Sequence, residues 1–442
     1  MARAKKEAAL TPEERLQAAL VPDWEWPYKL PENWCWTYFK SISTIQTGRK
    51  DANYGSDEGK YPFFTCAAEP IRCHGYSFDC RAILLAGNGD INNISRYNGK
   101  FEAYQRTYVV KIAEPLCFDY IFYWFKYRWF DFNKGKMFGT AIPYIRLGNL
   151  QEFPTPIPPL AEQQRVVDRI ESLFAKLDEA KEKAQAVVDS FETRKAAILH
   201  KAFTGELTAK WREEHNISKT TWGEKKWGDF LQSIEAGKNW SAEGRSPEGT
   251  EFGVVKVSAV TWGEFDELES KTCVVAEQWN SKTQIHKGDF LFSRANTLQL
   301  VGNCVIVRNI SKRLMLSDKI LRFKFDEIAD PRFVLYFTRS RIYREQVEQL
   351  ASGNQDGMRN ISQKNLKLVS FPIPTVVEQI EIISILDRAF AKEQQAKEAA
   401  EIVLDQIELM KKSILARAFR GELGTNDPSE ESAVELLRNS IN

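Results

Sequence analysis

The sequence predicts an α+β protein in which two α/β modules are separated by two long antiparallel coiled-coil helices, as a pseudo-two-fold internal repeat. The first observation is a duplication: residues 145–207 recur at 361–423 without a gap, with 26 of 63 positions identical. Its period of 216 residues is too long for a solenoid, so whole modules are repeated. The second is a heptad pattern in both copies, and the third is a set of short strand-like runs between turn signals.

The heptad pattern follows a Pro-Ile-Pro entry in each copy and ends at Gly205 and Gly421, which are natural helix stops. Apolar residues alternate at steps of four and three, as in a left-handed coiled coil. The predicted spacer residues are Val166, Ile170, Leu173, Leu177, Ala184, Phe191 and Ile198 in the first copy, and Ile382, Leu386, Ala400, Ile407 and Ile414 in the second. The same pattern includes Val403 and Met410. We expect the two copies to pair with each other, although separate partner proteins for each helix remain an alternative.

These features divide the chain into seven segments. They are an N-terminal extension (1–31), a first module (32–155), a first helical spacer (156–207), a linker (208–221), a second module (222–371), a second helical spacer (372–423) and a C-terminal tail (424–442).

In the extension and first module, local signals predict the main elements. Thr11-Pro12-Glu13-Glu14 predicts a capped helix that continues to about Leu20. Strands are expected within Trp34–Ile45, Ala82–Ala86 and Arg106–Ile112, and an aromatic helix at Phe118–Phe130.

The second module repeats this plan with more divergence. Ser233-Ile234 is aligned with Ser41-Ile42, and Pro331–Leu350 is expected to be the counterpart helix. A short amphipathic piece, Ala433–Arg438, follows the second spacer.

Composition and motifs favour a binding protein over an enzyme. The net charge of +1 gives no global basic field, and no phosphate-binding loop or methyltransferase motif occurs. Asp51, Glu58 and Lys60 form a weak nuclease-like set that chance explains in a charged chain. No catalytic residue is assigned.

Seven cysteines without a secretory signal indicate reduced thiols and a cytoplasmic protein. Zinc binding at Cys66, Cys73, His74 and Cys80 is a minor alternative, because no Cys-x-x-Cys pair occurs. No run is long and apolar enough to span a bilayer. We therefore assign no metal site and no membrane contact.

Local polar clusters are the direct indication of DNA, because Asn, Gln, Ser and Arg side chains suit base edges and Lys suits phosphates. The same residue types also fill ordinary turns. The predicted DNA-binding set is Asn92, Asn93, Arg96, Tyr97, Asn98, Lys100, Tyr104, Gln105, Arg106, Lys134 and Lys136 in the first module, and Ser293, Arg294, Asn296, Thr297, Gln299, Lys319, Asn354, Gln355, Arg359 and Asn360 in the second.

With its doubled Pro-Ile-Pro-x-x-x-Glu-Gln and Phe-x-Gly-Glu-Leu motifs, the chain resembles the specificity (S) subunits of type I restriction–modification enzymes. Leu30–Trp34, Ala86–Asp90, Phe292–Thr297 and Asn360–Ser362 also look like that family. The resemblance covers nearly the whole chain and implies two target-recognition domains, each reading one half of an asymmetric bipartite DNA site.

The same resemblance implies that the helices set the gap between the half-sites. Two modification subunits with S-adenosylmethionine would dock on this chain. Two restriction subunits, which carry ATP-driven translocation and nuclease chemistry, would join them, and ATP and Mg²⁺ would be bound in partner subunits. This chain itself would need no cofactor. The family carries over no fixed base-reading residues. The long N-terminal extension departs from the pattern, and we expect it to pack near the C-terminal tail or to touch a modification subunit.

A protein-interaction scaffold with coiled-coil recruitment helices and no DNA specificity is the alternative function. Salt-sensitive affinity for duplex DNA would separate the two, because phosphate contacts release counterions.

Overall fold

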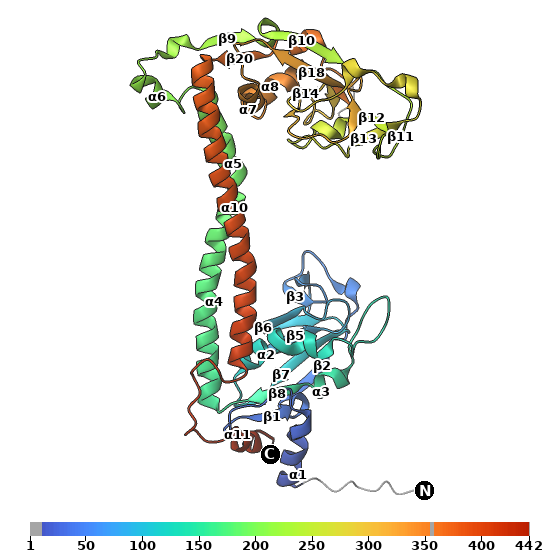
Figure 1. Ribbon diagram of the computed structural model, residues 1–442. Coiled ribbons are helices and arrows are strands. Elements are labelled where there is room, and N and C mark those ends of the chain that lie inside the picture. The colour runs from blue at the N-terminus through green and yellow to red at the C-terminus, as the bar shows by residue number, and fades with distance from the viewer. Residues whose placement is uncertain (1–10, 354–357, 442) are drawn as a thin grey trace. The chain divides into compact units, whose positions relative to one another are not determined.

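The computed structural model describes residues 11–353 and 358–441 and divides into two compact units (Figure 1). The first unit contains Met1–Ala184 and Ile402–Asn442, and the second contains Gln185–Glu401. Each unit combines one α/β module with a pair of helix segments. The predicted α+β class is therefore confirmed. None of the described helices is long and apolar enough to cross a membrane.

The first module is built on a six-stranded sheet. Its strands are, in spatial order, β2 (Ser43–Thr47), β7 (Thr107–Ile112), β5 (Phe78–Ala86), β6 (Ile94–Ala103), β3 (Tyr61–Phe64) and β4 (Ile71–Cys73). A separate antiparallel pair joins β1 (Cys35–Tyr38) to β8 (Pro154–Ile157). The module also contains α2 (Phe118–Asn133) and α3 (Leu147–Gln151).

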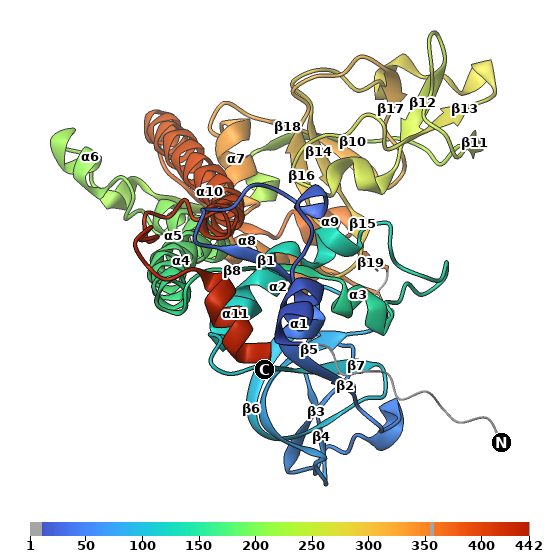
Figure 2. The ribbon, with the colours of Figure 1, turned by 90° about the horizontal axis from the view of Figure 1, so that it is seen from below.

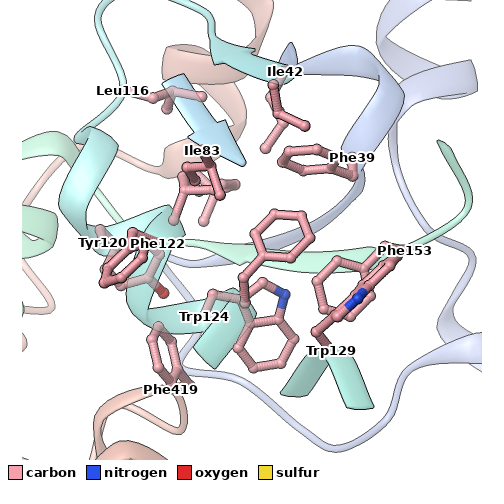
Figure 3. Close-up of a cluster of buried hydrophobic side chains, with 14 of the residues drawn as sticks. Phe39, Ile42, Ile83, Leu116, Tyr120, Phe122, Trp124, Trp129, Phe153 and Phe419 are labelled. Carbon is pink, nitrogen blue, oxygen red and sulfur yellow. The ribbon is translucent and has the colours of Figure 1, made fainter. Parts of the chain in front are cut away.

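The aromatic helix α2 forms the centre of this module's core (Figure 3). Trp124 and Trp129 are fully buried, and Phe153 packs against both of them. Phe419, from the end of the second spacer, packs against Trp124 with ring centroids 5.0 Å apart. Such rings bury a large apolar area, which fixes the spacer end on the module.

The second module has two four-stranded sheets. The first sheet has the order β10 (Leu231–Ala236), β18 (Ile320–Phe325), β14 (Phe290–Ser293) and β16 (Cys304–Ile306). The other sheet has the order β11 (Ala242–Glu243), β13 (Ser270–Cys273), β12 (Phe252–Val255) and β17 (Arg313–Met315). Two short pairs join β9 (Gly223–Lys226) to β20 (Ser370–Ile373), and β15 (Ala295–Asn296) to β19 (Arg359–Asn360).

The linker contains α6 (Ala209–Glu214), and the module contains α7 (Pro331–Phe337), α8 (Arg341–Leu350) and α9 (Gln363–Leu366). The prediction of one helix over Pro331–Leu350 is wrong, because the chain forms α7 and then α8. Helix α7 ends at Phe337, and Ser340 caps α8, since its hydroxyl accepts a hydrogen bond from the Tyr343 amide at 3.2 Å.

Equivalent backbone bonds correct the alignment of the two modules. The Phe39 amide donates to Phe153 O, and the Trp227 amide donates to Val369 O, both at 3.0 Å. Phe39 therefore corresponds to Trp227, a shift of 188 residues. The predicted equivalence of Ser41-Ile42 with Ser233-Ile234 is wrong by four residues, because two chance identities outweighed strand register.

The spacers are helices α4 (Leu160–Asp189), α5 (Phe191–Phe203) and α10 (Val376–Ala418). The first spacer is interrupted at Ser190, where one continuous helix was expected. In the first unit Lys181 pairs with Glu408 at 2.7 Å, and Asp178 pairs with Lys411 at 2.5 Å. Moving up the first spacer from Asp178 to Lys181, the paired residue moves down the second spacer from Lys411 to Glu408, so these segments are antiparallel. In the second unit Arg194 pairs with Glu393 at 2.6 Å.

The heptad pattern predicts two sets of buried positions along α10, and the structure confirms one set and contradicts the other. Ala400, Ile407 and Ile414 are buried or partly buried, whereas Val403 and Met410 are exposed. Lysines, and not Val403 and Met410, complete the face that packs on the first spacer. Lys411 Nζ lies 5.2 Å from the centroid of the Phe174 ring, and Lys397 Nζ lies 5.0 Å from that of Phe191. Long lysine stems can cover aromatic rings while their charge reaches water. The prediction considered apolar residues alone, and it therefore assigned Val403 and Met410 to the packed face in place of the lysines.

All the other spacer residues predicted in this way are at least half-buried. They are Val166, Ile170, Leu173, Leu177, Ala184, Phe191, Ile198, Ile382 and Leu386.

The N-terminal extension packs against the C-terminal tail within the first unit. Helix α1 (Pro12–Ala19) lies beside α11 (Ala433–Ile441), as Figures 1 and 2 both show. Next to the extension, at the start of the first module, Trp34 Nε1 donates to Asn426 Oδ1 at 3.0 Å, and Asn33 Nδ2 donates to Asp427 O at 2.9 Å. Of the two expectations for the extension, packing near the tail is the one observed.

The Glu-Gln pair of each spacer motif has a structural role. Glu162 accepts a hydrogen bond from Thr425 Oγ1, and Glu378 accepts one from Thr208 Oγ1, both at 2.7 Å. Thr208 directly follows the Phe-x-Gly-Glu-Leu motif of the first copy, and Thr425 lies two residues after that of the second. The start of each spacer is thereby locked to the end of the other.

The neighbouring glutamines fix the modules to the spacers. Gln163 Oε1 accepts from the Cys117 amide before α2, and Gln379 Oε1 accepts from the Asp330 amide before α7, both at 2.8 Å. The duplicated motif thus holds both junctions with the same chemistry.

Candidate nucleic-acid interface

A hairpin with the same backbone pattern occurs near the end of each module. In the first hairpin (residues 138–144), Phe138 and Tyr144 exchange two backbone hydrogen bonds of 2.9 Å. In the second hairpin (residues 352–360, of which 352, 353 and 358–360 are described), Ser352 and Asn360 exchange two of 2.8 Å.

Each hairpin is attached to the end of a central strand of its module. The Ile145 amide donates to Gly87 O, and the Ile361 amide donates to Arg294 O, both at 2.9 Å. Ile145 and Ile361 are buried and are related by the 216-residue repeat. The hairpins are therefore equivalent surfaces of the two modules.

The second hairpin brings together two clusters that the sequence predicted separately. Through the pairing of β15 with β19, Asn296 lies opposite Arg359, and Asn360 lies opposite Ala295. Arg294 Nε donates to Asn360 Oδ1 at 3.3 Å, and Asn296 Nδ2 donates to Thr261 Oγ1 at 3.3 Å. Two guanidinium and two amide side chains, all suited to base edges, are thus concentrated at one site.

Other members of this predicted set have different surroundings. Ser293 is fully buried, so its prediction as a DNA contact is wrong; its hydroxyl points to the Ala295 carbonyl at 3.4 Å. The Lys319 carbonyl accepts from the Arg294 amide, and the Thr297 amide donates to Asn296 Oδ1. Gln299 is exposed. Asn354 and Gln355 lie outside the described residues.

In the first module, exposed cations surround the base of the hairpin. Lys134 and Lys136 are exposed between α2 and the hairpin. Arg146, which follows it, stacks on Phe138 with its guanidinium carbon 3.9 Å from the ring centroid. Sequence reasoning missed Arg146, because a single arginine in a loop carries no signal until the hairpin closes beside it.

The predicted set around β6 is less concentrated. Asn93 Nδ2 donates to Cys66 O at 2.9 Å, Arg96 pairs with Asp119, and Tyr97 packs on Phe64 in the module's core. These three side chains have structural roles. Lys100 Nζ lies 4.8 Å from the centroid of the Tyr76 ring, and the backbone of Tyr104 forms an isolated parallel β-bridge with that of Lys50. Asn92, Asn98, Gln105 and Arg106 are exposed.

The residues of the zinc and nuclease alternatives lie in the described part of the chain. There, no group of three or more His, Cys, Asp or Glu side chains could hold a metal ion. Asp51 caps its own turn, since it accepts from the Ala52 amide at 2.6 Å. Burial raises the pKa of the Cys35 and Cys304 thiols to about 12, which disfavours reactive thiolates there.

Comparison with known proteins agrees with the resemblance. The family model described as "Type I restriction modification DNA specificity domain" matches residues 31–188 and 219–402. The chain is 26% identical over 398 residues to the type I restriction enzyme EcoDI specificity subunit of Escherichia coli, covering 86% of each protein.

Two solved structures share the fold. The HsdS subunit from Thermoanaerobacter tengcongensis has a TM-score of 0.59 at 19% identity, over 90% of this chain and 100% of that one. A chain from a structural study of type I R-M complex assembly has a TM-score of 0.61 at 19% identity, with the same coverage. Since the family model matches most of the sequence, twice and in order, this chain belongs to the type I restriction modification DNA specificity family.

Proposed function

We propose that this chain is the DNA sequence-recognition subunit of a type I restriction–modification complex, in which each module reads one half of an asymmetric bipartite site. The observation that carries the proposal is the repeated hairpin. The two hairpins share one backbone pattern, but their side chains differ. Equivalent surfaces with unlike donors and acceptors suit a ligand made of two equivalent but unlike halves.

The side chains indicate how each half would be read. Around the second hairpin, Arg294 and Arg359 have the donors for guanine, and Asn296 and Asn360 suit adenine. Around the first hairpin, Lys134, Lys136 and Arg146 suit phosphates.

The partners follow from the family and from the outer face of α10. Ile402, Val403, Leu409 and Met410 are exposed on that helix and repeat every seven residues. Such a stripe suits a helix of a modification subunit. Two modification and two restriction subunits would complete the assembly. S-adenosylmethionine, ATP and Mg²⁺ would reside in those partners, and this chain would be a non-catalytic cytoplasmic component.

Methylome sequencing tests this proposal directly. A host that expresses this chain with its cognate modification subunit should acquire adenine methylation at one bipartite motif with two unlike halves. An assembled complex that adds no methylated motif would favour the scaffold alternative. The same experiment identifies the bases read.

A further inference from the structure

The two hairpins share a feature that base reading alone does not require. Ile142 in the first hairpin and Met358 in the second lie just before the repeat and are separated by the same 216 residues, and both are large, apolar and exposed, at 62% and 60%. Each lies three residues before the buried isoleucine that anchors its hairpin. Isolated exposed apolar residues are common, but recurrence at one structural position in two diverged modules calls for a cause.

The backbone around both residues is built in the same way. Gly139 (φ +82°) and Gly353 (φ +136°) directly follow the bridge residues Phe138 and Ser352. A Cβ atom on Gly139 would lie 2.7 Å from Ile142 O, and one on Gly353 would lie 2.8 Å from Met358 O. Glycine alone permits both the left-handed conformation and this close approach. The presentation of the two apolar side chains is therefore part of the hairpin design.

The surroundings of both residues fit one ligand. Lys134, Lys136 and Arg146 flank the first hairpin, and Arg294 and Arg359 flank the second. A bare apolar side chain among cations suits a polymer with an anionic backbone and apolar ring faces. Duplex DNA has both, and apolar side chains that insert between base steps unstack and kink it.

We propose that Ile142 and Met358 are paired wedges, each of which packs into a base step of its own half-site and partly unstacks it. This inference rests on the proposed DNA-reading function. It adds readout through deformability of the step, so specificity would extend to bases that no polar side chain touches.

The test uses the full complex with its modification subunits and a duplex carrying the methylated motif. 2-Aminopurine replaces in turn each adenine of either strand except the methylated adenines, and its fluorescence is measured with and without the complex. The wild-type complex should raise the fluorescence at one step in each half-site. Ile142→Ser should abolish the rise in the half read by the first module only, and Met358→Ser in the other half only. Each serine variant should weaken binding about tenfold.

Matched variants keep the test specific. Ile142→Leu and Met358→Leu should behave as wild type, and so should Leu147→Ser, which removes an exposed apolar side chain of α3 outside the hairpin. Serine variants that retain both fluorescence and affinity would overturn the wedges. A wild-type complex that binds its motif without any rise would also overturn them and leave the DNA-reading function standing. A wild-type complex with no preference for the motif would instead overturn the function itself.

A thymine-methyl contact is the remaining outcome. Replacing thymine by uracil in one half-site could weaken wild-type binding as much as the serine substitution does, without a rise in 2-aminopurine fluorescence at any step. The side chain would then contact a thymine methyl group and would not be a wedge.

Discussion

Arg294 shows how a single side chain acquires a defined place from the strands around it. Its backbone carbonyl anchors the second hairpin through Ile361, and its side chain bonds to Asn360. The sequence identified Arg294 as a DNA-reading candidate from its residue type and its neighbours. It could not distinguish Arg294 from Ser293, because only strand register decides which of two adjacent residues faces the core.

Replacing Arg294 by alanine should weaken binding of the complex to its motif about 10- to 100-fold, because one bidentate base contact contributes about 1–3 kcal/mol of discrimination. Competition binding with duplexes altered in one half-site at a time measures the effect. The loss should appear as relaxed selectivity in the half read by the second module, with the other half still required. Arg341→Ala is the matched control, because Arg341 is highly exposed and pairs with Glu345 on α8. Unchanged selectivity in R294A would remove Arg294 from the interface.

At the scale of elements, the duplicated spacer motif forms two junctions, each of which joins the start of one spacer to the end of the other, and the two junctions differ in their ion pairs. Arg212 and Glu378 are both buried, with Arg212 Nη1 donating to Glu378 Oε1 at 2.5 Å, and Trp222 Nε1 also donates to Glu378. At the equivalent junction Arg165 is bonded to Glu162 and, through two bonds of 2.8 Å, to Glu430. Burial raises the pKa of the Glu162 carboxyl. The second unit therefore depends on one acid where the first has two.

Glu378→Ala should destabilise the second unit by about 3–5 kcal/mol, because it leaves the buried Arg212 without its acid. Glu162→Ala should cost clearly less, since Arg165 keeps Glu430. Urea unfolding of the isolated chain, followed by tryptophan fluorescence, measures both variants. Equal losses in the two would contradict the unequal junctions.

At the scale of the whole molecule, the chain separates what is repeated from what varies. The spacers and their motifs keep one register over 63 positions, while the modules differ in sheet composition and in hairpin side chains. We expect the paired spacers to set the distance between the two half-sites.

A matched deletion of residues 175–181 and 408–414 tests this expectation. It removes one heptad from each antiparallel segment together with both partners of the Lys181–Glu408 and Asp178–Lys411 pairs. Seven residues at about 1.5 Å each correspond to about three base pairs of duplex at about 3.4 Å each. Methylome sequencing should therefore show the same half-sites with a gap shorter by about three base pairs.

Deletion of residues 175–181 alone is the contrasting variant, because it shifts one heptad seam against the other and should abolish methylation. An unchanged gap in the matched deletion would show that the spacers do not measure the site.

By itself the sequence determined the duplication, the two modules, the long spacer helices and the family resemblance, because repeats and heptad periods are written in local order. It also placed Lys134, Lys136, Arg294, Asn296, Arg359 and Asn360 among the candidates. Only the tertiary structure decided which candidates meet, which neighbours of the heptad are buried, and that Ile142 and Met358 occupy equivalent exposed positions. Those outcomes depend on strand register and on long-range backbone bonds, which join residues as far apart as Arg294 and Ile361 and leave no local trace in the sequence.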